Sequence, residues 1–430
     1  MAFRIFERLF VIAFLLLSMQ VAIGLTSPGE AEVGTDPTVT SPPVHVPHAV
    51  LELGVDLGGA LLIALRWPRV LRAARAVWPL LVLTALAALS AAWSAQPGVT
   101  FRRSALLVVT TFLAIYLGER YSIEEQARLL AHTFCLMISA ILILYFAAPR
   151  YVIDYVSHPG AWKGLSAHKN SFGQYMAIAV LLLSLVRFRK FRWLRYPFLI
   201  AAAILLFLTQ SAASLFCCVL IIAVMPLWRS AQMRGKQRLA LCAMAVCFLI
   251  AGVCFMATNT DWLFHWLGRN ATLSGRTQLW ASILPAIMKH PILGYGYDTF
   301  WVSPIGEVFD IRAQAGWLVH VADNGFLDLG LSLGILGVCL FFLTFALSFR
   351  NGIDYFKSES RSLGLWPISY LCFFLLHNMA ESTLLARGGF AFLVFVMLTT
   401  VLALHRGKAV LAYVAADTSY GECELVPNTL

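Results

Sequence analysis

Two segments of the chain combine basic side chains with glycines and helix-start residues. The first covers residues 162–170 (WKGLSAHKN) and leads directly into an apolar run at Ser171. A helix that begins here presents free N–H groups and a partial positive charge. Lys163 and Lys169 add full charges, so the segment is a candidate anion site. The alternative is that Asn170 or Ser171 is a simple N-cap and the lysines extend toward water.

The second segment covers residues 268–280 (GRNATLSGRTQLW) and is followed by residues 290–297 (HPILGYGY). Arg276 lies at the start of a short amphipathic helix that we predict from Thr277 to Lys289. A guanidinium makes bidentate contacts with phosphate oxygens, which an ammonium cannot copy. The glycines permit tight turns and close approach of the backbone to a ligand. The pattern favours an anionic, membrane-held ligand, and the alternative is a loop lying on anionic headgroups.

These segments carry a family resemblance. The patterns W-x-G-x-x-x-H-K-N, G-R-x-x-x-x-x-G-R-x-x-x-W and H-P-x-x-G-x-G resemble the bacterial O-antigen ligase and polymerase superfamily, above all its exopolysaccharide polymerase branch. Asn324, followed after nine residues by Gly334 and then Gly337, is similar to the H-N-x9-G-x-x-G signature of that superfamily. Glu381 resembles a recurring acidic position. The resemblance covers approximately residues 100–405.

The resemblance implies a membrane glycosyltransferase that polymerises or ligates glycan carried on undecaprenyl diphosphate, in exopolysaccharide or O-antigen biosynthesis. It implies a helical fold similar to membrane glycosyltransferases with lipid-linked donors (GT-C-like), with no metal and no cofactor. The expected partners are the undecaprenyl-diphosphate-linked oligosaccharide, membrane lipid, and a chain-length regulator or export complex. Two alternatives stay open: a transporter or flippase of lipid-linked glycan, and a non-catalytic member of the family.

A lipid diphosphate leaves readily only when fixed cations in a partly dry site neutralise its developing charge. The acceptor hydroxyl must be oriented and must lose its proton. The expected substrate-binding residues are Arg276, Lys169, His168, Arg269, Trp280 and Glu381. The expected catalytic residues are Asp323, His320 and Asn324.

The chain departs from the superfamily pattern at two positions. Asp323 stands where the ligases have a histidine, and either Asp323 or the nearby His320 is expected to take over its role. Many relatives carry a lysine or arginine near the position of Ala212, after a serine, and this chain has no base there. One anion-binding charge is therefore missing. Both departures bear on the activity more than on the fold.

The elements that position these residues are expected to span a membrane. The chain of 430 residues is 60% hydrophobic and 13% charged, whereas soluble domains are about half apolar and a quarter charged. Apolar segments near the length of a membrane span predict an all-α, polytopic protein of about twelve transmembrane helices. The segments are 9–26, 49–65, 77–94, 104–118, 128–147, 171–187, 195–209, 212–228, 239–257, 325–347, 364–380 and 389–404.

The basic residues predict the orientation. Most of the 32 lysines and arginines fall on one side when the N-terminus is placed in the cytoplasm, as the positive-inside rule expects. This predicts an N-in/C-in inner-membrane protein with its active face in the periplasm. Because cytoplasmic loops account for the net charge of +10, no nucleic-acid partner is expected. The expected divisions are about three N-terminal helices in 1–100, a ligase-like membrane domain in 101–405 with a large periplasmic loop at 258–324, and a cytoplasmic tail at 406–430.

Overall fold

The computed structural model of the chain describes residues 2–21, 46–155, 158–188, 192–230, 276–303, 305–359 and 362–423. Within these ranges the fold is all-α, as predicted, and the one β-type pairing is an isolated bridge between Ile153 and Trp162. The α-helices are α1 (Ala2–Ser18), α3 (Val46–Leu65), α4 (Trp67–Ala76), α5 (Trp78–Leu89), α6 (Pro97–Arg120), α7 (Ile123–Ala147), α8 (Lys169–Leu185), α9 (Arg195–Leu208), α10 (Ala212–Ser230), α13 (Arg276–Lys289), α14 (Gly306–Ala315), α15 (Gly325–Ser358), α16 (Trp366–His377) and α17 (Phe390–Cys423). Short 3-10 helices are η1 (Ser90–Ala92), η2 (Pro149–Tyr151), η3 (Arg192–Leu194), η5 (Phe300–Val302) and η6 (Ser362–Leu365).

Helices occupy the predicted apolar segments wherever these fall in the described ranges; segment 239–257 lies outside them. In the described residues, α6, α7, α15 and the first part of α17 are long and apolar enough to cross a membrane. The pair α4 and α5, bent by 98°, is a fifth candidate. Shorter apolar helices cover 195–208, 212–226 and 362–377. The protein is therefore a multi-pass membrane protein, and the number of twelve spans stays a prediction.

Two helix boundaries differ from the expected ones. Residues 67–76, which we placed in a cytoplasmic loop, form α4, because Val70, Ala73 and Ala74 recur at helical spacing and are buried. The bend to α5 occurs at Val77, just before a second proline-started helix. The last helix, α17, continues to Cys423 instead of ending near 404.

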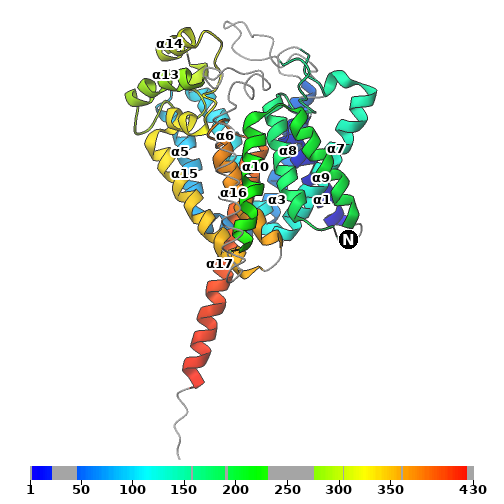
Figure 1. Cartoon of the computed structure of the whole chain (residues 1–430). Helices are drawn as coiled ribbons and strands as arrows, with labels where there is room; N and C mark the ends of the chain where they lie inside the picture. Colours follow the sequence, from blue (N-terminus) through cyan, green and yellow to red (C-terminus); the bar gives the residue numbers. More distant parts are fainter. Residues whose placement is uncertain are drawn as a thin grey trace, which may run out of the picture.

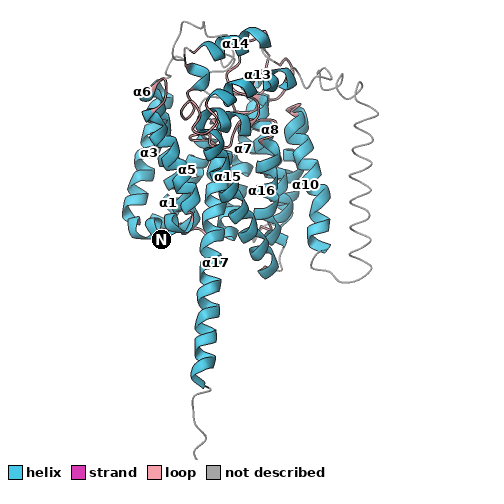
Figure 2. Cartoon of the chain, turned by 90° about the vertical axis from the view of Figure 1, so that its left-hand side faces the viewer, coloured by secondary structure: helices cyan, strands magenta, loops and turns pink. Residues whose placement is uncertain are grey.

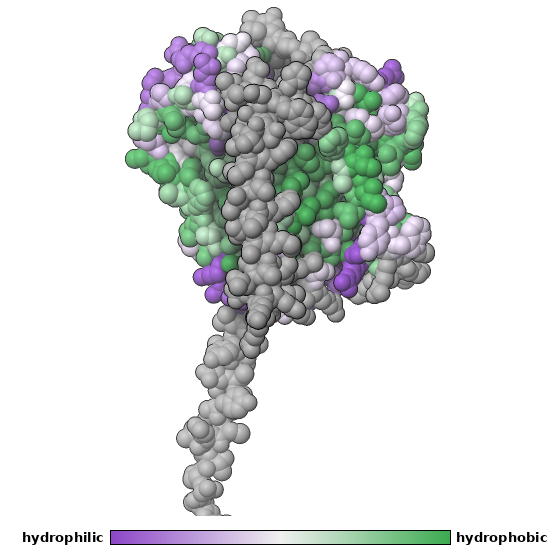
Figure 3. All heavy atoms as spheres, in the orientation of Figure 1, coloured by the Kyte–Doolittle hydropathy of each residue, from purple (hydrophilic) through white to green (hydrophobic). Residues whose placement is uncertain are grey.

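The helices pack as a bundle with a folded cap at one end. Residues 276–303 and 305–324, called the cap below, include α13 and α14 (Figure 1). The N-terminus and the end of α17 lie away from the cap (Figures 1 and 2). On the face shown in Figure 3, hydrophobic side chains form a band between hydrophilic groups near the cap and at the opposite end. This arrangement is typical of a protein surrounded by lipid.

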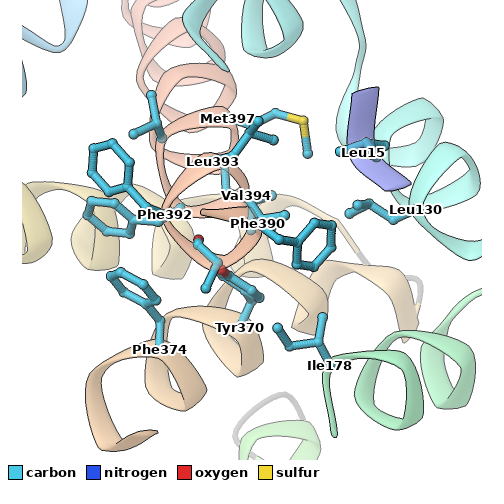
Figure 4. Close-up of a cluster of buried hydrophobic side chains, with 14 of the residues drawn as sticks. Leu15, Leu130, Ile178, Tyr370, Phe374, Phe390, Phe392, Leu393, Val394 and Met397 are labelled. Carbon is cyan, nitrogen blue, oxygen red and sulfur yellow. The ribbon is translucent and has the colours of Figure 1, made fainter. Parts of the chain in front are cut away.

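The centre of the bundle is built from helices that are apolar on all sides. Tyr370 and Phe374 of α16 meet Phe390 and Phe392 of α17, and all four are almost completely buried (Figure 4). The rings of Phe374 and Phe395 stack with centroids 4.8 Å apart. Residues of α1, α7 and α8 close the cluster from the other side (Figure 4). The loops at the cap end of α16 and α17 therefore start from a rigid base.

A buried ion pair joins α1 to α6. Arg120 donates from Nε to Glu7 Oε1 (2.7 Å) and from Nη2 to Oε2 (2.9 Å), and the Tyr116 hydroxyl donates to Oε1 (2.6 Å). Glu7 is only 1% exposed. Removing one partner of such a pair leaves an uncompensated buried charge, which costs about 3–5 kcal/mol.

We therefore expect Arg120→Met to lower the thermal midpoint of the purified protein strongly. Adding Glu7→Leu is expected to restore much of the loss, because both charges are then gone. The control is Arg128→Met, which breaks the more exposed pair with Glu124 and is expected to cost less than about 1 kcal/mol. Equal effects of Arg120→Met and Arg128→Met would contradict the prediction. Thermal unfolding in detergent measures all four proteins.

The predicted loop helix is confirmed as α13, and the cap has a core of its own. Leu279 and Ile283 of α13 pack with Phe300 and with Val308 and Ile311 of α14. Two of its aromatic side chains bond to backbone carbonyls of the cap itself. Trp280 Nε1 donates to the Ala322 carbonyl (2.9 Å), and the Tyr295 hydroxyl donates to the Ala286 carbonyl (2.9 Å). The cap is thus a folded unit that holds Arg276 at its edge.

The cap is joined to a break in α15. Gly334 has φ 60° and ψ −162°, which interrupts the helix. Residues 291–296 pair with the exposed backbone there: Tyr295 N donates to Leu331 O (2.8 Å) and Ile335 N to Pro291 O (2.8 Å). A Cβ on Gly334 would lie 2.3 Å from Ile292 O, and one on Gly294 would lie 2.6 Å from Leu331 O. Gly294 and Gly334 thus bring two backbone segments together, whereas for the glycines of the second segment we had expected tight turns and close approach to a ligand.

Candidate functional site

The two basic segments found in the sequence meet at the cap end around Arg276. Arg276 is the first residue of α13 and is 9% exposed. Its Nε donates to Asp323 Oδ2 (3.2 Å), Nη1 to the Ala380 carbonyl (2.7 Å) and Nη2 to Glu381 Oε1 (3.3 Å). The guanidinium therefore joins α13 to the loop before α15 and to the loop after α16.

Glu381 links this cluster to the start of α8. Its Oε1 also accepts a hydrogen bond from Asn170 Nδ2 (2.8 Å). His168 is the N-cap of α8, with Nδ1 accepting from Asn170 N (3.1 Å). The alternative of an N-cap at Asn170 or Ser171 is therefore wrong, and the Asn170 side-chain amide bonds to Glu381 instead. The anion-site segment and the Arg276 segment, more than 100 residues apart, share one carboxylate.

Two lysines of the first segment are withdrawn from solvent. Lys163 is 5% exposed and Lys169 is 6% exposed. Trp162 N donates to Leu208 O (3.0 Å), which fixes Lys163 beside the turn that starts α10. Lys163 makes no ion pair with any described residue. A charged group rarely stays buried without a partner, so an anionic ligand at this position has a physical reason.

Asp323 occupies a constrained backbone position. Its φ is 50°, a value that residues other than glycine rarely adopt. The next residue fixes it: Asn324 Oδ1 accepts from Phe326 N (3.0 Å) and Leu327 N (3.3 Å), as an N-cap of α15. The Asp323 side chain is 37% exposed, so its carboxylate faces both Arg276 and solvent. Asn324 is thus a positioning residue in this geometry.

Asp328 is a buried anchor that the sequence analysis missed. Its Oδ1 accepts from Trp301 Nε1 (2.7 Å), and its Oδ2 accepts from Ala322 N (3.0 Å) and from the Ser382 hydroxyl. Ser382 Oγ in turn accepts from Asn324 N (3.1 Å). These bonds fasten both loops that approach Arg276. An aspartate in the first turn of a helix is an available signal, but it does not reveal such distant partners.

The turn between α9 and α10 contains serine side chains near Ala212, where the resemblance had predicted a basic residue. Ser211 donates to Ser214 Oγ (3.0 Å), which lies 3.0 Å from His377 Nε2. The other ring nitrogen of His377 lies 3.1 Å from Gln174 Nε2. His377 is almost fully buried. The hydrogen-bonded network replaces the missing charge with neutral dipoles.

The remaining predicted residues lie apart from the Arg276 cluster or outside the described ranges. His320 is exposed and shares no hydrogen bond with the Arg276 cluster. Its pKa is lowered below the usual value because part of the ring is shielded from water and because Arg312 is nearby. Trp280 belongs to the cap core. Arg269 lies outside the described residues. Within the described ranges, no group of three or more His, Cys, Asp or Glu side chains is placed to hold a metal ion.

Comparison with known proteins gives two findings. A family described as O-antigen ligase matches residues 197–342, which run from α9 to the middle of α15. The resemblance to the O-antigen ligase family is confirmed. A second similarity is to the exopolysaccharide production protein ExoQ of Rhizobium meliloti (strain 1021), at 25% identity over 308 residues, which are 67% of this chain and 69% of ExoQ.

The O-antigen ligase match includes one half of the site. Arg276, Asp323 and Asn324 lie inside the matched residues. Lys169 and Glu381 lie outside them, and Glu381 contacts both Asn170 and Arg276. The site is therefore assembled around the matched region by helices α8 and α16 that flank it in the bundle.

Proposed function

We propose that the protein is a membrane glycosyltransferase that polymerises or ligates undecaprenyl-diphosphate-linked glycan at the periplasmic face of the bacterial inner membrane, in exopolysaccharide or O-antigen biosynthesis. The observation that carries the proposal is the buried Arg276, held between Asp323 and Glu381 at the cap end of a membrane bundle. The likenesses to the O-antigen ligase family and to an exopolysaccharide production protein support it.

Arg276 is the proposed contact for the departing diphosphate. A guanidinium has five N–H groups, and three of them make the bonds to Asp323, Ala380 and Glu381. Two N–H groups on the Nη atoms are left for a phosphate. Because Asp323 and Glu381 together outweigh the one positive charge, a diphosphate needs further cations. Lys163 and Lys169 are the further cations that we propose, and their charges would act strongly because both side chains are withdrawn from water.

Asp323 is the proposed proton acceptor. In the reaction, the acceptor hydroxyl oxygen bonds to the anomeric carbon of the donor sugar and gives its proton to the Asp323 carboxylate. The bond from that carbon to the diphosphate breaks, and the electron pair leaves with the diphosphate. Arg276 holds Asp323 through Nε and has N–H groups on Nη1 and Nη2 left for the diphosphate. One side chain would therefore position both the proton acceptor and the leaving group.

The runner-up functions are a transporter of lipid-linked glycan and a non-catalytic family member. A transporter is expected to place its charges near the middle of the membrane. Here Arg276, Asp323 and Glu381 lie together at the cap end. The neutral network around Ser214 favours the non-catalytic alternative. The glycan analysis described next tests this alternative as well.

The test is analysis of lipid-linked glycans in a strain that lacks the gene. We expect lipid-linked glycan to accumulate: single repeat units indicate a polymerase, and long untransferred chains indicate a ligase. Complementation with Asp323→Asn is expected to lower product by about 100-fold or more. His320→Gln, the matched control, is expected to change it less than about threefold, since its ring lies apart from the cluster. Normal product in the deletion strain would refute the proposed function. Full activity of Asp323→Asn would show that Asp323 is not the proton acceptor.

A further inference from the structure

One helix lies across the others at the end of the bundle opposite the cap. α4 meets α5 at an angle of 98°. α5 runs from this end to the cap end, because Trp78 starts it directly after α4 and Ser90, just past its last residue, accepts a hydrogen bond from Tyr297 N of the cap (2.8 Å). α4 begins beside the end of α6 that is distant from the cap, where Arg66 pairs with Glu119 (3.6 Å). Because α5 follows the length of the bundle, α4 lies parallel to the membrane surface.

Two sides of α4 are apolar and have different neighbours. Val70, Ala73 and Ala74 are buried against the bundle. Trp67 stacks on Phe112 of α6, with ring centroids 6.1 Å apart, and keeps 48% of its surface exposed. Phe112 lies about two turns before the end of α6, so the indole extends from the surface of the bundle toward the interior of the membrane. An exposed tryptophan in this position is typical of the boundary between lipid and water.

The remaining face of α4 is basic. Arg69, Arg72 and Arg75 recur at every third position, and all three are exposed. Arg72 Nε donates to the Pro68 carbonyl of the same helix (3.4 Å), and none of the three makes an ion pair with a described residue. α4 itself has no acidic residue. Its three charges therefore have no counterion in the part of the protein that the structure describes.

The positions of these charges go beyond what membrane topology requires. An irregular basic loop satisfies the positive-inside rule as well as a helix does. Here the buried side of α4 holds three guanidiniums on one rigid face, next to a tryptophan that reaches toward lipid. A helix that lies in the membrane plane with arginines on its polar face and tryptophan beside them binds anionic lipid by combined apolar and electrostatic contacts.

We propose that the face formed by Arg69, Arg72 and Arg75 binds the headgroups of anionic phospholipids, in the leaflet opposite the cap. Guanidinium groups make forked contacts with phosphate oxygens, and three of them in a row favour a negatively charged membrane over a zwitterionic one. Because α4 packs on α6 and continues directly into α5, bound lipid stabilises this end of the bundle. The inference concerns the membrane surface away from Arg276 and does not depend on the proposed function.

The test compares the purified protein in nanodiscs of phosphatidylcholine with the same protein in nanodiscs that also contain phosphatidylglycerol. We expect phosphatidylglycerol to raise the thermal midpoint of the wild-type protein. The triple variant Arg69→Gln, Arg72→Gln, Arg75→Gln is expected to lose most of this gain and to match wild type in phosphatidylcholine alone, since the three side chains are exposed. Its dissociation constant for phosphatidylglycerol, measured by native mass spectrometry, is expected to rise by about fivefold for each arginine and by about 100-fold in total.

Two further variants separate the face of α4 from charge in general. The matched control replaces by glutamine three exposed basic residues at the same end of the bundle, on other elements, and is expected to keep most of the gain: Arg187, Arg350 and Lys357. The variant with lysine at all three α4 positions keeps the charges and is expected to keep most of the gain as well. It also supports the interpretation if the glutamine variant folds poorly.

Four outcomes would overturn the inference. Absence of any gain in the wild-type protein shows that anionic lipid does not bind with effect. An equal gain in wild type and in the α4 glutamine variant places the lipid elsewhere, and if that variant also fails in cells, its arginines contact an acidic protein instead. An equal loss in the matched control shows a general response to surface charge. Loss of the gain in the lysine variant excludes attraction by charge as the cause. All of these measurements are made without glycan, so a failure of the proposed function leaves them unaffected.

Discussion

Replacing Arg276 by lysine is expected to reduce glycan transfer by about 100-fold or more, although the positive charge is kept. A lysine ammonium cannot reach Asp323, Ala380 and Glu381 in one plane as the guanidinium does. The two loops that carry Asp323 and Glu381 then lose their common partner, and the diphosphate loses a forked contact. Loss of one such group in a preorganised site costs about 3–4 kcal/mol in the transition state. In-cell glycan length and transfer by the purified protein both measure the effect.

A matched change at the other end of the same helix separates this loss from general damage to the cap. Lys289 is the last residue of α13 and pairs with Glu307 at 2.7 Å, with more than half of its side chain exposed. Lys289→Ala is expected to keep nearly full activity, since exposed pairs contribute at most about 1 kcal/mol. Arg276→Ala is expected to be at least as severe as Arg276→Lys. Full activity of Arg276→Lys at normal protein level would mean that only the charge matters and would remove the forked contact from the mechanism.

The hydropathy of the chain predicted the helices of the bundle but not their exact course. Apolar runs locate membrane helices because the requirement is local: about 20 apolar residues and satisfied backbone groups. The break at Val77 and the continuation of α17 past 404 do not follow from the apolar runs. The orientation in the membrane stays a prediction from the basic residues.

The motifs predicted some residues that lie together but not how they interact. Asp323 and Glu381 do contact the Arg276 guanidinium, and Asn324 caps the helix that follows Asp323. The sequence predicted a phosphate contact at Arg276 and no protein partner for it, whereas the structure pairs it with two carboxylates. Such pairings join residues separated by 47 and 105 positions, and no local pattern encodes them. The same limit explains why Asp328 was missed and why His320 was retained as an alternative to Asp323.

The glycine motifs lead to the second large prediction, which concerns folding. Gly334→Ala is expected to abolish accumulation of folded protein. Its backbone, at φ 60° and ψ −162°, lies in a region that only glycine adopts readily, at a cost of about 1–3 kcal/mol for other residues. The added Cβ would lie 2.3 Å from the Ile292 carbonyl oxygen, and that backbone cannot yield without breaking the bonds from Tyr295 and Ile335. The measurement is the amount of monodisperse protein after detergent extraction, with its thermal midpoint.

Gly306→Ala is the control for this prediction, because it lies in the same cap and a Cβ there meets no atom within 4 Å. It is expected to accumulate and work as wild type does. A stable but inactive Gly334→Ala would contradict the prediction and would show that the glycine is needed for activity and not for folding. The expected loss of fold follows from a chain of contacts. Gly334 opens α15, residues 291–296 fill the opening, and the cap they support begins at Arg276. A methyl group far from the reacting atoms would therefore remove the guanidinium on which the proposed chemistry depends.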